Sequence, residues 1–357
     1  MSESDKEKTL TALRDLLETC KAALSALRAT TAYEQAGTQE ITSVLRNDAI
    51  SIHRLVYSNT TRLSIALGKP PPSYDVALVP IKDLNTEVGQ LVSCASLFSS
   101  HSLRREIAWA AEETIQALSG LSKHFLDTCQ KGITDEAYLA KTGAVHEAVR
   151  KAERVSENEF AAFTKTWASN GESIKDSLSE VKQLLEEQPD DDKLDEEDGW
   201  DDALGQSMPK LSETEIERVK KLFPLFRFTT LLHDKVLSDH ISHLKLSKIP
   251  EDKISNHLNS LLTFSNSILM GNDDLASALY APQDLDNIRE CVGIVMGIVH
   301  DFDRELGITK TKTNLTPDEL AETLECLTLG QNNESMKWFQ KCLQQIDKFH
   351  AGLSLDG

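Results

Sequence analysis

Three histidines in the second half of the chain have the type and spacing of metal ligands: His233, His240 and His243. A seven-residue step is close to two helical turns, so His233 and His240 share one helical face. The apolar stripe that starts at Ile216 and Val219 also reaches both of them in steps of three and four. Metal sites in helical bundles use further ligand pairs such as Glu-x-x-His, and the sequence contains none. We therefore predict buried core histidines, with no metal and no cofactor.

Motifs of known catalytic chemistry are absent from the sequence. His146-Glu147 is not followed by the second histidine of H-E-x-x-H, and Gly68-Lys69 has no glycine-rich loop before it. Neither the G-x-S-x-G nucleophile elbow nor the G-x-G-x-x-G fingerprint occurs. The sequence therefore predicts a protein that is not an enzyme.

An acidic segment, Glu186 to Asp202, carries eleven carboxylates against the single cation Lys193. It supplies about half of the chain's net charge of −19. A calcium loop aligned on Gly199 would place Leu194 and Gly205 at its first and last ligand positions, where carboxylates are required. A solvated charge run is the better interpretation. Such a chain repels phosphate, so we expect basic protein partners and neither nucleic acid nor membrane.

The acidic segment is also the candidate partner-binding site. Trp200 is the single aromatic residue of this acidic segment. An aromatic side chain among carboxylates can anchor such a segment on a basic surface with an apolar centre. Packing of Trp200 back onto the second half of the chain is the other interpretation. The candidate residues are Asp190, Asp191, Asp192, Asp195, Glu196, Glu197, Asp198, Trp200, Asp201 and Asp202.

Long helical stripes fill the sequence on both sides of the acidic segment. Apolar residues recur in steps of three and four from Leu10 to Leu27, from Leu84 to Phe98, from Leu103 to Phe125, from Phe160 to Leu185 and from Leu285 to Leu306. No segment alternates with the two-residue period of a strand. The longest apolar run, 291–299, is far shorter than the roughly 20 residues that cross a bilayer. An all-α protein with no membrane span is predicted.

The turns between the stripes predict two antiparallel helical bundles joined by the acidic linker. We expect a first bundle of five or six helices over 1–188, a linker over 189–210 and a second bundle of four or five helices over 211–357. Local signals add detail to the second bundle. Ser212 and Glu215 form a capping-box pattern, Pro224 predicts a kink or local break, and Gly271-Asn272 is expected to close a helix that begins near Asp252.

The chain resembles the Grap- and cyclin-D-interacting protein family, also called the cyclin-D-binding protein family, as a distant member. The matching pieces are Asn47-Asp48-Ala49 leading to Thr60-Thr61-Arg62-Leu63, then Leu103-Arg104-Arg105, and Thr142-Gly143-Ala144-Val145 before Ala148. The acidic break before a long amphipathic helix at 215–241 completes the pattern. This chain has His146 where an aromatic residue is often found in the family.

The resemblance implies a non-enzymatic regulator of the cytoplasm and nucleus. Such a protein binds D-type cyclins or helix-loop-helix transcription factors and restrains cell-cycle progression. Two alternatives belong to other classes. Tandem helical bundles also resemble cytoskeletal adaptors of the vinculin and α-catenin type, and a metal-dependent oxidoreductase would require bound metal in the purified protein.

Overall fold

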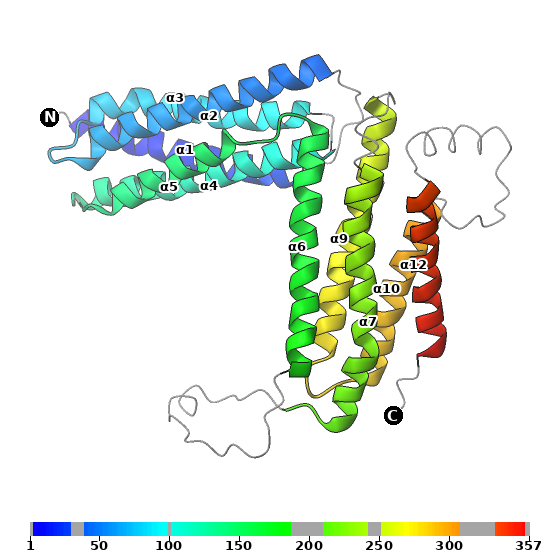
Figure 1. Cartoon of the computed structure of the whole chain (residues 1–357). Coiled ribbons are helices and arrows are strands. Elements are labelled where there is room, and N and C mark those ends of the chain that lie inside the picture. Colours follow the sequence, from blue (N-terminus) through cyan, green and yellow to red (C-terminus); the bar gives the residue numbers. More distant parts are fainter. Residues whose placement is uncertain are drawn as a thin grey trace. The chain divides into compact units, whose positions relative to one another are not determined.

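The computed structural model describes residues 3–29, 39–98, 101–133, 135–186, 210–241, 251–306 and 333–353. Within these ranges the regular structure is helical and contains no strand (Figure 1). The chain divides into two compact units, Met1–Phe163 and Thr164–Gly357. The prediction of an all-α protein in two helical parts is confirmed.

Five helices in the first unit pack side by side (Figure 1). They are α1 (Glu3–Ala29), α2 (Gln39–Gly68), α3 (Tyr74–Leu97), α4 (His101–Lys131) and α5 (Ala137–Ala152). Helix α1 packs on α3 and α4, α2 packs on α3 and α5, and α5 packs on α4, which closes a ring. The predicted stripes supply its core, where Leu13, Leu84, Val88 and Leu118 are buried.

The second unit contains most of α6 (Glu159–Glu186) together with four later helices (Figure 1). These are α7 (Glu213–Lys235), α9 (Glu251–Ala278), α10 (Leu285–Leu306) and α12 (Asn333–Gly352), and a short π-helix, η2 (Val236–Ile241), extends α7. Helix α9 packs on α10 and α12 packs on α7. His300 of α10 lies 2.9 Å from Asp347 of α12. The stripe predicted for 285–306 is confirmed, since its apolar residues form the buried face of α10.

Side-chain bonds assign α6 to the second unit. The Asn170 amide donates to Ser265 Oγ at 2.9 Å and to Asn266 Oδ1 at 2.8 Å on α9, and Ser177 donates to Asp273. The unit boundary therefore falls at Phe163, ahead of the predicted boundary at 188. Except for Lys210, the predicted linker 189–210 lies outside the described residues, so its bounds stay a prediction.

Gly271 does not close a helix, and this prediction was wrong. Helix α9 continues through it to Ala278. A β-carbon on Gly271 would lie 3.2 Å from Val295 Cγ2 and 3.3 Å from Ile298 Cδ1, so the glycine serves the close approach of α9 to α10. Its neighbour Asn272 is buried and donates to Thr229 Oγ1 at 3.0 Å.

Gly271→Leu should destabilise the second unit by about 1–3 kcal/mol, because the added side chain forces α9 and α10 apart. Gly293→Leu on α10 is the matched control, since a β-carbon there meets open space. The control should change stability little, or raise it by up to about 1 kcal/mol through helix propensity. Urea unfolding followed by circular dichroism measures both. Equal effects at the two glycines would contradict the packing explanation.

The capping box at the start of α7 is confirmed. Ser212 Oγ accepts from the backbone N–H of Glu215 at 3.4 Å, and the Glu215 carboxylate accepts from the backbone N–H of Ser212 at 2.7 Å. The same carboxylate accepts from the backbone N–H of Gln283 at 2.9 Å, and these bonds lower the pKa of Glu215. Pro224 lies inside α7, which continues past it, so the predicted local break is absent.

Ser212→Ala should lower the free energy of unfolding by about 1 kcal/mol, since it removes the side-chain partner of the Glu215 N–H. Ser58→Ala, at an exposed position inside α2, is the comparison. It should change stability by no more than about 0.5 kcal/mol. Thermal unfolding of the two variants side by side measures the difference, and a cost at Ser58 equal to that at Ser212 would argue against the cap.

Candidate functional site

The predicted partner-binding residues lie outside the described part of the structure. They fall within 187–209, which the structure does not describe. The site therefore stays a prediction for Asp190, Asp191, Asp192, Asp195, Glu196, Glu197, Asp198, Trp200, Asp201 and Asp202. The described residues contain other groups whose types could bind a ligand or catalyse a reaction, and their geometry decides whether they can do so.

Two of the sequence pieces that resemble the cyclin-D-interacting family lie against each other between α2 and α5. Ser64 Oγ is 2.6 Å from Thr142 Oγ1, and Thr61 Oγ1 is 3.1 Å from His146 Nε2. The His146 ring stacks on Tyr57 with centroids 3.8 Å apart. His146 thus takes the aromatic position with an imidazole that also hydrogen-bonds. These pieces hold α5 on α2, which is a structural role.

The other two pieces position helix ends and the core. The Glu159 carboxylate accepts from the backbone N–H groups of Ser102 and Leu103, each at 2.8 Å, and so caps the start of α4. Near the start of α2, Ala49 is buried and its carbonyl lies 2.7 Å from His53 Nδ1. Burial lowers the pKa of His53, which keeps the imidazole neutral. Sequence comparison alone does not separate such structural residues from functional ones.

His233 and Ser265 have the spacing of a base and a nucleophile, with Nε2 2.8 Å from Oγ. Both side chains are fully buried, however, and the His233 ring stacks on Trp167 with centroids 4.3 Å apart. Burial lowers the pKa of His233 to about 3. A pair that no substrate can reach serves packing, so the prediction of a core histidine is confirmed for His233. The side chains of His240 and His243 lie outside the described set.

Reactive cysteines and metal ligands are likewise missing from the described ranges. Five cysteines there are free and buried: Cys20, Cys94, Cys129, Cys291 and Cys342. Burial raises the pKa of Cys20 to about 12 and that of Cys94 to about 11, so these thiols stay protonated and inert. No group of three His, Cys, Asp or Glu residues there is placed to hold a metal ion. Nor is any described helix long and apolar enough to cross a membrane.

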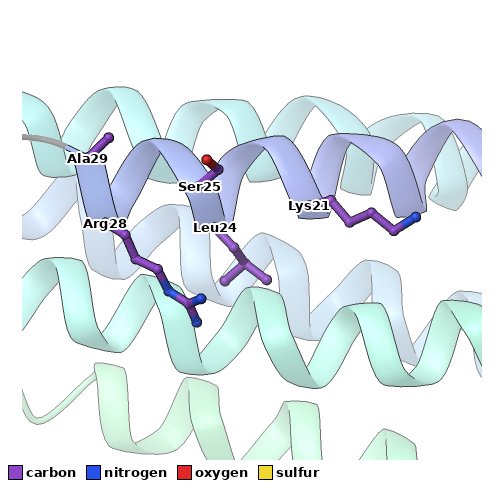
Figure 2. Close-up of a pocket in the computed structure, with 5 residues that line it drawn as sticks. All are labelled: Lys21, Leu24, Ser25, Arg28 and Ala29. Atoms are coloured by element: carbon purple, nitrogen blue, oxygen red, sulfur yellow. The ribbon is translucent and has the colours of Figure 1, made fainter.

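A surface depression of about 560 Å³ lies along α1 (Figure 2). Its lining residues all come from this helix: Lys21, Leu24, Ser25, Arg28 and Ala29. Arg28 reaches from α1 to α4, where its Nε donates to Glu112 at 2.8 Å. Four of the five residues are exposed, whereas small-molecule sites enclose most of their ligand. The depression is therefore not a ligand pocket.

Comparisons with known proteins identify the family. The sequence model described as "Grap2 and cyclin-D-interacting, N-terminal" matches residues 48–187, and its C-terminal counterpart matches 195–300. The gap between the two matches falls within the acidic segment. No curated protein sequence matches the chain. Because the two matches together span more than half of the 357 residues, the chain belongs to the Grap2 and cyclin-D-interacting protein family.

Proposed function

We propose that this protein is a non-enzymatic interaction regulator that binds a D-type cyclin or a helix-loop-helix factor and restrains cell-cycle progression or transcription. The observation that carries the proposal is the match to both family models, whose description names cyclin D and Grap2 as interaction partners of the family. The proposal includes action in both cytoplasm and nucleus.

The proposed mechanism is sequestration of the partner through helix-to-helix contacts. Amphipathic helices bind in grooves between other helices, and fixed charge accelerates their encounter. The acidic segment carries about half of the net charge, so it is the natural source of that steering. Its carboxylates and Trp200 remain the proposed contact residues. The burial of His233, Ser265 and the described cysteines supports a role without catalysis.

Co-purification from cells followed by mass spectrometry tests this function. Wild type is compared with a variant whose carboxylates from Asp190 to Asp202 are changed to Asn and Gln. Recovery of a cyclin or a helix-loop-helix factor, lost in the variant and reproduced with purified proteins, is the expected result. Recovery of actin-linked proteins by both baits equally would replace the proposal with the cytoskeletal adaptor.

A further inference from the structure

Buried and half-buried side chains join four of the described helices in the second unit to one another. The pairs are Trp167 with His233 between α6 and α7, Asn170 with Ser265 between α6 and α9, Asn272 with Thr229 between α9 and α7, and Phe264 with Phe302 between α9 and α10. Helix α12 takes no part in these pairs and lies beside α10 at the edge of this unit (Figure 1). It is therefore a further helix, added to a bundle whose other members already hold together.

An apolar stripe holds α12 on α7 and α10. Its buried members are Phe339, Cys342, Leu343 and Ile346. Near one end of the helix, the Trp338 ring centroid lies 5.8 Å from the Lys235 amine of α7. Near the other end, Asp347 Oδ1 lies 2.9 Å from His300 Nε2 of α10, and both of these side chains are more than half exposed. Such exposed pairs contribute little stability, so the buried stripe supplies most of the hold on α12.

The side of α7 that meets α12 is apolar next to Lys235. Leu232 and Phe228 lie three and seven residues before Lys235, so helical spacing places them on the same side as the contact with Trp338. Leu232 is fully buried and Phe228 is half-buried. The π-helix η2 begins directly after Lys235, and its Asp239 lies 2.8 Å from the Lys235 amine. Departures of this kind from α-helical bonding are frequent at functional sites. Release of α12 would therefore open an apolar surface at an irregular part of α7.

We propose that the surface of α7 and α10 beneath α12, which we call the α12 site, binds an amphipathic helix of a protein partner in place of α12. Helix α12 itself shows the chemistry of the occupant, with aromatic residues at the start of an apolar stripe. While α12 occupies the site it competes with the partner, so the free protein binds with reduced apparent affinity. This inference deepens the proposed function, since it locates the helix-to-helix contact, and it rests on that function only in taking the partner to be a protein.

The charges of the α12 site favour a basic occupant. Helix α12 carries three lysines, Lys337, Lys341 and Lys348, against two carboxylates. The range of α10, 285–306, contains five carboxylates and two cations. A partner helix with lysine or arginine outside its apolar stripe would therefore be attracted to the site, whereas an acidic helix would be repelled.

A labelled peptide with the sequence of residues 333–353 serves as the probe, and its binding to the full chain is followed by fluorescence anisotropy. Ile346→Ala in the chain removes a fully buried side chain from its own α12. The site is then open in a larger fraction of molecules, so this variant should bind the peptide about tenfold more tightly than wild type does, or better. Gln345→Ala, at an exposed position on the same helix, should bind the peptide as wild type does.

A photoreactive phenylalanine in place of Trp338 of the peptide locates the binding. It should crosslink to α7 around Lys235, because the ring of Trp338 lies near this residue in the chain. Phe339→Ala loosens α12 nearer its start, so it is a second variant that should raise the affinity for the peptide. Circular dichroism and thermal unfolding should show that the other helices of both variants remain folded, since they contact one another directly.

Equal affinity of the peptide for wild type, the two loosened variants and Gln345→Ala would overturn the proposal. Crosslinks confined to the first unit would do so as well. A dimer of wild type that Ile346→Ala abolishes would also contradict it, because α12 of a second copy would then be the occupant.

The outcomes also separate this inference from the proposed function. If neither a cyclin nor a helix-loop-helix factor binds while loosening α12 still raises the affinity for the peptide, the proposed function fails and the α12 site stands. If a cyclin binds wild type and the loosened variants equally and the peptide does so as well, the proposed function stands and the α12 site fails.

Discussion

Trp167→Ala should cost about 3–5 kcal/mol of stability in the second unit, the largest effect expected from a single substitution in this chain. Trp167 of α6 is fully buried. Its ring stacks on His233 at 4.3 Å between centroids, and its Nε1 donates to the His233 carbonyl at 3.3 Å. Alanine would leave a cavity between α6 and α7 and would remove the hydrogen bond that joins them.

Trp109→Ala is a matched control for that cavity. Both tryptophans lie inside long helices, but Trp109 of α4 is 58% exposed. Its replacement should change stability by no more than about 0.5 kcal/mol. Urea unfolding of the full chain, followed by circular dichroism, compares the two. Similar losses at both positions would show that helix content, and not the buried stack, determines the result.

The burial of Trp167 was predictable from sequence, but its packing partner was not. The stripe from Phe160 to Leu185 shows that one face of α6 is buried. It does not show which helices cover that face, because any neighbouring bundle can bury an apolar stripe. The acidic segment suggested that α6 belongs with the helices before it, whereas Asn170 and Trp167 bond to residues 66 to 96 positions later in the chain.

Gly271 also shows that a local sequence signal does not reveal which distant helix a residue packs against. A glycine followed by asparagine is typical of a helix end, and the sequence around it gives no sign of a crossing. Only the position of Val295 and Ile298 on another helix explains the residue. The capping box at Ser212 was predictable because all of its atoms lie within four consecutive residues.

The candidate functional residues likewise include some whose position was predictable from the sequence and some whose contacts were not. His233 was placed correctly in the core, because its position in the heptad stripe fixes its side of the helix. The family-like pieces around Thr61 and Thr142 were recognised, but their mutual contact spans 78 to 85 residues and could not be read from either piece.

A buried carboxyl in the first unit should make stability depend on pH. Glu87 of α3 is 5% exposed, and its Oε1 accepts from the Asn59 amide at 2.6 Å. Burial raises the pKa of Glu87 from 4.5 to about 7, against the opposing effect of the Asn59 bond. The nearby Asp83 charge adds to the rise. The folded state therefore holds a proton that the unfolded chain releases.

Stability should accordingly fall as pH rises from about 4.5 to about 7, by up to about 3 kcal/mol, and then level off. Glu87→Gln keeps the shape and the neutral form, so its stability should equal that of wild type near pH 4.5 and exceed it above pH 7. Glu157→Gln, at an exposed position in the same unit, should follow wild type at every pH. The unfolding midpoints of wild type and of the two variants, measured across this pH range, test the prediction. A constant difference between Glu87→Gln and wild type would mean that the substitution alters packing alone and that the carboxyl does not titrate between the two states.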